Sequence, residues 1–277
     1  MTARFPGRSR GGRALLGAAL LVLSACDAGE TLDIGADARS AACNAPPTAP
    51  PAALALDPFY AQYLDAAGIP VVSSAAVPPQ ALALSCLTVE HMLKQRPDVQ
   101  QAMVTLDMRV AVIARGEVTT DLPEYADLNT AYPGTNWDAL RGVGATLVRP
   151  VSSVGEENVL CLADDPYRGE SILVQTFATA VLLGVENVDS SYQARLGQAF
   201  TAAMSAGLWQ STFATQNQIE YYAMGVQDWF DAGGQAVPAD GVHNQIHTRD
   251  GLEAYDPGLA GLVGETMPDD AWRPHCP

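Results

Sequence analysis

The chain has 277 residues, of which 48% are hydrophobic and 17% charged, and 31 acidic against 15 basic residues give it a net charge of −16. This acidity argues against nucleic-acid binding and against electrostatic attachment to anionic lipid, because both depend on clustered lysine and arginine. The length is enough for one domain with a sizeable core and for additional N-terminal segments.

The first 25 residues have the parts of a secretory signal peptide. A stretch with four arginines and no acidic residue precedes an apolar run, residues 15–23. This run is shorter than the about 20 apolar residues that a membrane-spanning helix needs. It leads into Leu-Ser-Ala-Cys, ending at Cys26, which resembles the lipobox of bacterial lipoproteins. The alternative is an ordinary signal peptide followed by an incidental cysteine.

We therefore expect residues 1–25 to be removed and Cys26 to carry the lipid that anchors the chain to the membrane. This predicts an exported protein of the bacterial cell envelope, on the periplasmic face or at the cell surface. Removal of four arginines would leave 11 basic against 31 acidic residues, a net charge of −20. Residues 26–57 are rich in alanine and proline, which predicts an extended tether. Residues 58–277 then form a single domain.

Four further cysteines indicate disulfides, because their number is even and the chain is expected to be exported. They are Cys43, Cys86, Cys161 and Cys276. Three pairings are open, and no two of the cysteines have the Cys-x-x-Cys spacing of a zinc site.

The apolar periodicity predicts a helix-dominated α+β domain with a small sheet. We expect short strands at residues 69–73 and 108–114, and a loop-rich region from 116 to 158. Helices are expected at residues 59–67, 80–95, 99–106, 169–184, 190–206, 217–231 and 257–265.

The helix expected from residue 169 is apolar nearly all round, which is typical of a core helix. Its polar exceptions are Gln175, Thr176 and Thr179. Gln175 and Thr179 are four residues apart and share a face. These side chains are either hydrogen-bonded within a core or form a polar stripe that faces a cleft.

Much of the chain from about residue 58 onward resembles a family of secreted proteins classed as zinc metallopeptidases, of the zincin-like type, whose helix carries His-Glu-Phe-Ala-His. The similar segments are residues 146–161, 165–174, 207–209, 217–231, 240–244, 248–249, 254–257 and 276–277. The resemblance implies a zincin-like metallopeptidase domain.

Position by position, the family's two zinc-binding histidines align with Gln175 and Thr179, and its catalytic glutamate aligns with Thr176. Glu220 aligns with a glutamate that, by analogy with other zinc peptidases, is the third ligand. Met224 takes the place of a second glutamate nearby, and which of these two glutamates is the ligand stays open.

A further family residue, a tyrosine able to stabilise the oxyanion, aligns with Phe213, which has no hydroxyl group. Catalytic zinc needs three histidine, cysteine or carboxylate ligands and a base that accepts a proton from the bound water. The substituted positions offer an amide and two hydroxyl groups instead. The sequence therefore predicts that zinc binding and hydrolysis are lost.

The sequence also offers two other candidate metal sites. His243 and His247 have the four-residue spacing of a metal-binding pair, although the preceding proline and glycine favour a loop there. With Glu220 they would form a relocated zinc site. Acidic pairs at residues 156–157 and 164–165 would suit calcium, but such pairs more often form a solvated loop.

The leading interpretation is a catalytically inactive, metallopeptidase-like lipoprotein without a zinc cofactor, which binds an extended peptide or an envelope protein in the former active-site cleft. One alternative is a metal-dependent peptidase that uses Glu220, His243 and His247. Another is a purely structural lipoprotein of the envelope. In each case the membrane is a partner through Cys26 and nucleic acid is not.

Overall fold

The structure is a computed structural model, and it describes residues 41–275. Contacts divide the chain into two units, Met1–Gly35 and Ala36–Pro277, and every described residue belongs to the second unit. The expected signal peptide, the lipidation site Cys26 and the C-terminal Cys276 lie outside the described residues.

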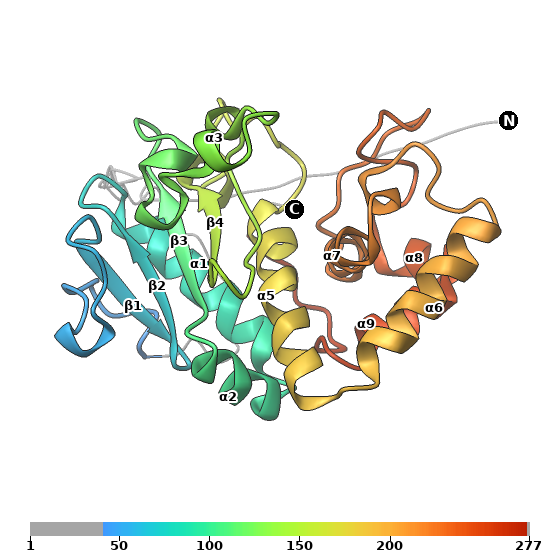
Figure 1. Cartoon of the computed structure of the whole chain (residues 1–277), viewed down its shortest axis with the longest axis horizontal. Coiled ribbons are helices and arrows are strands. Elements are labelled where there is room, and N and C mark those ends of the chain that lie inside the picture. The colour runs from blue at the N-terminus through green and yellow to red at the C-terminus, as the bar shows by residue number, and fades with distance from the viewer. Residues whose placement is uncertain (1–40, 276–277) are drawn as a thin grey trace, which may run out of the picture. The chain divides into compact units, whose positions relative to one another are not determined.

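A four-stranded sheet runs in the order β1-β2-β3-β4, with β1 and β2 antiparallel and the other neighbours parallel (Figure 1). The strands are β1 (Gln62–Ala66), β2 (Ile69–Ser73), β3 (Arg109–Ile113) and β4 (Val151–Gly155). Nearly all their apolar side chains are buried, on both faces of the sheet. Such two-sided burial is typical of parallel strands.

Helices make up most of the regular structure. The longer ones are α1 (Pro79–Leu93), α2 (Pro97–Thr105), α5 (Ile172–Val188), α6 (Tyr192–Ser205), α7 (Gln218–Trp229), α8 (Arg249–Tyr255) and α9 (Pro257–Gly264). Short helices are α3 (Leu128–Ala131) and α4 (Glu156–Val159), and 3-10 turns are Ala52–Leu54, Thr119–Asp121, Pro123–Tyr125, Trp137–Ala139 and Phe213–Thr215. The predicted helix-rich α+β class is confirmed. Within residues 41–275 no helix is both long enough and apolar enough to cross a membrane.

The prediction of a helix at residues 59–67 is wrong, because this segment contains β1. A two-residue turn, Ala67-Gly68, joins β1 to β2, and both turn residues have positive φ (54° and 89°). This backbone is typical of the tight turns that connect antiparallel strands. The hairpin pairs Tyr63 with Val72, and this long-range pairing outweighs the local helical tendency.

Strand β4 and helix α8 were absent from the prediction, as were the short helices α3 and α4. Strand β4 lies in the region expected to be loop-rich, because its sequence Val-Ser-Ser-Val-Gly has no clear alternation. Helix α8 has only seven residues and starts at a Thr248 cap, whose hydroxyl accepts a hydrogen bond from the Gly251 amide. The other expected strands and helices are confirmed, with ends shifted by a few residues.

Three of the described cysteines, Cys43, Cys86 and Cys161, are in disulfides. Cys43 and Cys86 are bonded to each other, with their Cα atoms 5.4 Å apart. This bond joins part of the expected tether to α1. Thr48 also forms a bridge with Tyr63 of β1, so the tether contacts the domain before residue 58. Cys161 is disulfide-bonded as well.

Helix α5 is the central helix of the fold. It contacts β4 on one side and α7 on another, as Figure 1 shows, and α2 packs against a further side. Gly184 marks the side toward α2, because a Cβ atom there would lie 2.6 Å from Met103. The start of α5 is set by Ser171, whose hydroxyl accepts a hydrogen bond from the Val174 amide. This arrangement places the stripe of polar residues on α5 between β4 and α7.

Candidate functional site

The partly exposed residues in the body of α5 follow one face of the helix. Gln175, Leu183 and Glu186 are half-buried, whereas the other residues from 172 to 185 are buried. At 100° per residue these three positions, together with Thr179, fall within one quarter of the helix surface. This face of α5 is the only part of its central turns that reaches solvent, and it contains two of the positions predicted from the resemblance.

Gln175 and Met224 are brought together across α5 and α7. The Nε2 atom of Gln175 lies 3.7 Å from the Sδ atom of Met224, which is buried. Sulfur is a weak acceptor, so this contact adds little beyond packing. The two positions where the metallopeptidase family would have a histidine and a supporting glutamate are therefore neighbours here, but neither has a metal-binding group.

Glu220 lies one turn before Met224 on α7, where residues four apart share a face. Its amide is capped by the side chain of Asn217, at 3.0 Å. The carboxylate is half-buried and makes no hydrogen bond or ion pair with any residue from 41 to 275. Burial raises the pKa of this carboxyl group.

Thr176, at the position of the catalytic glutamate, joins α5 to β4. Its hydroxyl donates to the carbonyl of Ser153, at 3.0 Å, and its carbonyl accepts from the Ser152 hydroxyl, at 2.7 Å. The side chain is buried. This hydroxyl is therefore part of the contact between helix and sheet and is not available to a substrate.

Thr179, at the position of the second family histidine, also uses its hydroxyl group for hydrogen bonds within the fold. Its hydroxyl donates to the carbonyl of Thr176, at 2.7 Å, and lies 3.5 Å from the carbonyl of Ala145. A Cβ atom on Gly144 would lie 2.6 Å from the same hydroxyl oxygen. The chain around Gly144 thus lies directly on Thr179.

The segment from 141 to 145 forms an additional edge of the sheet, antiparallel to β4. The amide of Ser153 donates to the carbonyl of Val143, at 2.9 Å, and the amide of Gly155 donates to the carbonyl of Arg141, at 2.7 Å. The Val143 amide donates to the Ser153 hydroxyl, at 3.0 Å. We call this segment the open edge, because its other side has no such partners.

Gly142 and Gly144 supply the unpaired side of the open edge. Their amides and carbonyls make no hydrogen bond within the described part of the chain, and both residues are half-exposed. In an extended segment, successive residues direct these groups to opposite sides. Since Arg141 and Val143 face β4, the glycines face away from it. They lie above α5, where a Cβ atom on Gly142 would be 2.4 Å from Ile172.

Arg141 fixes the start of the open edge. Its guanidinium donates to both carboxylate oxygens of Glu157, at 2.5 and 2.9 Å, and to the carbonyls of Glu117 and Ala114, at 2.6 and 3.0 Å. Arg141 and Glu157 side chains are 13% and 5% exposed, so the pair is shielded from water. Bidentate pairs of this kind combine strength with a defined geometry.

Three of the four carboxylates weighed as calcium sites have side-chain partners, whereas the Oε2 atom of the fourth, Glu156, is buried without a hydrogen-bond partner. Glu157 binds Arg141, Asp164 forms an ion pair with Arg115, and Asp165 accepts from the amide of Asn158, at 2.9 Å. These carboxylates are used within the fold.

Phe213, aligned with the family tyrosine, is half-buried in a 3-10 turn before α7. Its amide donates to the carbonyl of Val242, at 3.0 Å, and the Gly241 amide donates to the carbonyl of Ser211, also at 3.0 Å. These bonds hold the loop around Gly241 against the turn that precedes α7.

The histidines of the relocated metal site bond elsewhere. The Nε2 atom of His243 donates to Glu170, at 3.1 Å, and this hydrogen bond raises the pKa of His243, although burial opposes it. His247 contacts the carbonyl of Gln245, at 3.3 Å. Neither is joined to Glu220, and residues 41–275 hold no group of three histidine, cysteine or acidic side chains placed to bind a metal.

Zinc does not fit the aligned positions. The amide of Gln175 contacts a thioether, and the hydroxyl groups of Thr176 and Thr179 donate to carbonyls. None of these groups is a ligand of the kind that catalytic zinc requires.

Asp228, on α7, was not singled out from the sequence. It is 1% exposed, and neither carboxylate oxygen has a hydrogen-bond partner in the described chain. Burial raises the pKa of this carboxyl group well above its ordinary value, although nearby His243 opposes the shift. Gly233 lies against it, since a Cβ atom there would be 2.3 Å from Oδ1. Burial of this kind leaves no signal in a single sequence.

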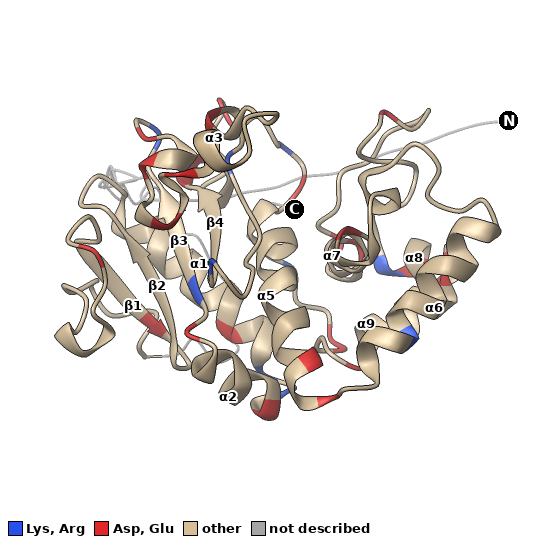
Figure 2. Cartoon of the chain, in the orientation of Figure 1, with Lys and Arg blue, Asp and Glu red and all other residues tan. Residues whose placement is uncertain are grey.

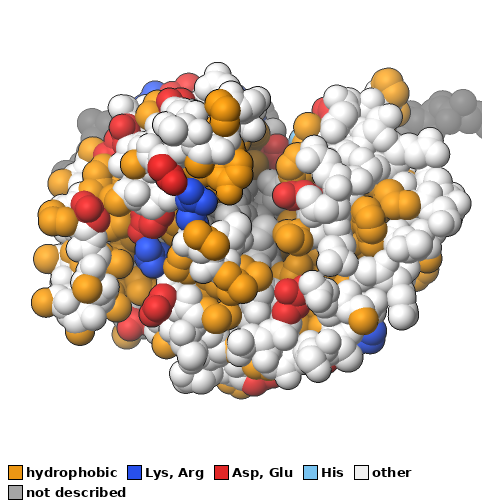
Figure 3. Space-filling view, viewed as in Figure 1, with side chains coloured by type: hydrophobic (Ala, Val, Ile, Leu, Met, Phe, Trp, Pro, Cys, Tyr) orange, Lys and Arg blue, Asp and Glu red, His pale blue; other side chains and the backbone are white. Residues whose placement is uncertain are grey.

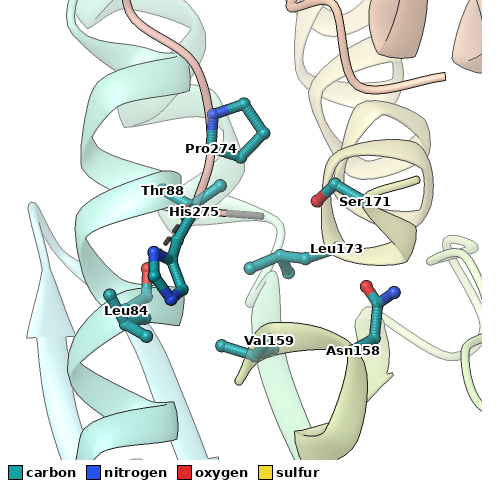
Figure 4. Close-up of a pocket in the computed structure, with 8 residues that line it drawn as sticks. All are labelled: Leu84, Thr88, Asn158, Val159, Ser171, Leu173, Pro274 and His275. Atoms are coloured by element: carbon teal, nitrogen blue, oxygen red, sulfur yellow. Dashed lines mark hydrogen bonds between the residues drawn. The ribbon is translucent and has the colours of Figure 1, made fainter. Parts of the chain in front are cut away.

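A small pocket lies apart from the open edge, between α1, the start of α5 and the C-terminal segment that ends in Pro274 and His275 (Figure 4). Its volume is about 10 Å³. This is room for about one water molecule, which the polar groups of Asn158, Thr88 and Ser171 would suit. The pocket is too small for a peptide or a cofactor.

No protein-family model matches the chain, and no curated protein matches it either.

Proposed function

We propose that the chain is a zincin-like, catalytically inactive relative of the zinc metallopeptidases, exported and lipid-anchored to the cell envelope, which binds an extended peptide at the open edge. One observation carries the proposal: unpaired backbone groups of Gly142 and Gly144 lie over the face of α5 from which the metal-binding residues are missing. An extended peptide can add to such an edge as a further strand, and this pairing requires no metal.

Two surface features support the proposal. The molecular surface is hollowed between the part that covers the loops beside β4 and the part that covers α7 and its loops (Figure 3). The turn that follows the open edge exposes two large aliphatic side chains, Leu147 and Val148, which are 66% and 83% exposed. An aliphatic pair at the end of an unpaired edge offers apolar contact to a bound peptide.

The loss of catalysis rests on the side chains of α5 and α7. Hydrolysis at these positions would need a base and three metal ligands. Thr176 and Thr179 are bonded within the fold, and Met224 is apolar. The relocated set of Glu220, His243 and His247 gains no support, because the bonds of His243 lead to Glu170 and Asp240.

The first experiment measures zinc content and peptide binding on the purified full chain. After dialysis against trace zinc we expect less than about 0.1 zinc per chain, because residues 41–275 hold no three-ligand set. Near-stoichiometric zinc that is lost in Glu220→Ala or His243→Ala would contradict the inactive assignment and support the relocated peptidase.

Peptide binding is measured by fluorescence anisotropy with labelled peptides of about ten residues, long enough to cover the open edge. One peptide carries methyl groups on alternate backbone amides, and a second carries them on every backbone amide. Pairing with an edge uses the amides of every second residue, so the first peptide should bind and the second should not. Equal loss in both peptides would exclude strand addition, and absence of binding by any peptide would favour a purely structural lipoprotein.

A further inference from the structure

The groove beside the open edge can be followed from named contacts. Its floor is the half-exposed face of α5, which carries Gln175, Leu183 and Glu186. The open edge lies on one side, where Gly144 meets Thr179. Helix α7 lies on the other, where Met224 contacts Gln175. Figure 3 shows the hollow between these parts of the surface, and Figure 2 shows acidic positions on both α5 and α7.

Two carboxylates of this groove are uncompensated. Glu220 on α7 and Glu186 on α5 are both half-buried, and neither makes a hydrogen bond or ion pair with any residue that the structure describes. Glu186 is eleven residues after Gln175, which places it on the same face about three turns along the helix. Burial raises the pKa of both groups, so a nearby positive charge would stabilise their charged forms.

Two arginines near the open edge are already neutralised. Arg141 is held by both oxygens of Glu157, and Arg149 donates to both oxygens of Asp127, at 2.8 and 2.9 Å. Within residues 41–275, neither Glu220 nor Glu186 therefore has a positively charged partner, in a chain whose net charge is −16.

We propose that the extended segment bound at the open edge is basic, with lysine or arginine side chains that reach Glu220 and Glu186. This inference rests on the proposed peptide-binding function. Backbone pairing with Gly142 and Gly144 gives affinity without regard to sequence, and the two carboxylates select positive charge. Charge complementarity of this kind contributes more to partner choice than to total affinity.

The test uses three peptides of one length and backbone that differ only at two central positions, which are both lysine, both glutamine or both glutamate. Anisotropy titrations at low and moderate salt use the full chain and the variants Glu220→Gln and Glu186→Gln. Glu253→Gln is the matched control, because Glu253 is an exposed carboxylate on α8, beside a surface pocket that includes Trp229.

We expect the lysine peptide to bind best and the glutamate peptide worst, with a difference that narrows as salt rises. Each groove variant should weaken the preference for lysine over glutamine by up to about fivefold, the upper range for a partly exposed ion pair. The control should leave the preference unchanged. An equal effect of Glu253→Gln would mean that overall acidity is responsible, which would overturn the inference.

Equal affinity for all three peptides, or tighter binding of the glutamate peptide, would also overturn the inference while leaving strand addition intact. If none of the peptides binds, the proposed function itself fails. The two failures are therefore distinguishable in one set of titrations.

Discussion

The side chains of Gln175 and Met224 meet between α5 and α7, with 3.7 Å between Nε2 and Sδ. In the metallopeptidase family that the chain resembles, these positions would be a zinc-binding histidine and a glutamate. The helices are thus in contact at the aligned positions, while the groups that would bind metal are replaced. This contact is consistent with the proposed function, in which the chain binds a peptide without a metal.

Thr176 is expected to stabilise the fold through its bond to Ser153. The Ser153 carbonyl has no other hydrogen-bond donor in the described structure, because the Val143 amide binds the Ser153 hydroxyl instead. Thr176→Val would leave this carbonyl unpaired, and we expect the free energy of unfolding to fall by about 1–3 kcal/mol. Urea unfolding measures the change.

Thr105→Val is the matched control for this substitution. Thr105 makes the same type of bond, to the Gln101 carbonyl at 3.0 Å, but on the exposed surface of α2. Its replacement should change stability by less than about 0.5 kcal/mol. Equal effects of the two substitutions would show that the contact between α5 and β4 has no special weight.

Because Gly144 lies so close to Thr179, we expect substitutions at these two positions to have coupled effects on stability. A Cβ atom on Gly144 would lie 2.6 Å from the Thr179 hydroxyl and 2.8 Å from its methyl group. Gly144→Ala should therefore destabilise the chain by about 1–3 kcal/mol. In a Thr179→Ala background the same change should cost less, because both clashing atoms are gone.

A double-mutant cycle in urea tests this coupling, with Gly134→Ala as control, since a Cβ atom there would meet nothing within 4 Å. An interaction free energy of at least about 0.5 kcal/mol is expected. Purely additive effects would mean that the open edge does not lie on Thr179 in solution.

The sequence predicted the elements with strong local patterns, such as β2 and β3 with their β-branched residues and α5 with its long apolar run. It did not predict β1, because the hairpin depends on a turn at Ala67-Gly68 and on pairing with β2. Gln175 was singled out as a polar exception on an apolar helix, whereas Met224 was singled out from the resemblance alone. The open edge was missed, because unpaired backbone groups depend on which strands lie beside them. The Gly-Val-Gly spacing at residues 142–144 was the available signal.

The ion pair of Arg141 and Glu157 should stabilise the fold far more than the ion pair of Arg115 and Asp164. The first pair is shielded, with side chains 13% and 5% exposed, whereas those of the second are 54% and 53% exposed. Arg141→Gln leaves a buried carboxylate without its partner, so we expect a loss of about 3–5 kcal/mol. Arg115→Gln should cost less than about 1 kcal/mol.

Thermal unfolding and peptide anisotropy of both arginine variants provide the measurement. Since Arg141 also fixes the start of the open edge, its substitution should weaken peptide binding at temperatures where the fold persists. Similar stability losses in the two variants would contradict the assigned burial. Unchanged peptide affinity in Arg141→Gln would mean that the peptide does not bind at the open edge.

Because the Asp228 carboxyl group is buried, we expect its contribution to the free energy of unfolding to fall as the pH rises. Burial holds its pKa well above the ordinary value, and neither carboxylate oxygen has a partner within residues 41–275. The folded chain therefore keeps this proton to a higher pH than the unfolded chain does. The resulting stability is fully present below the unfolded pKa of about 3.9 and is lost as the pH rises toward the raised folded pKa.

Asp228→Asn removes the titration, so we expect it to raise the free energy of unfolding at pH 7 by about 1–2 kcal/mol relative to its effect at pH 4. Urea unfolding at both pH values tests this, with Glu253→Gln expected to show no such difference. A variant that is destabilised equally at pH 4 and pH 7 would mean that the Asp228 carboxylate has a favourable partner in the folded chain.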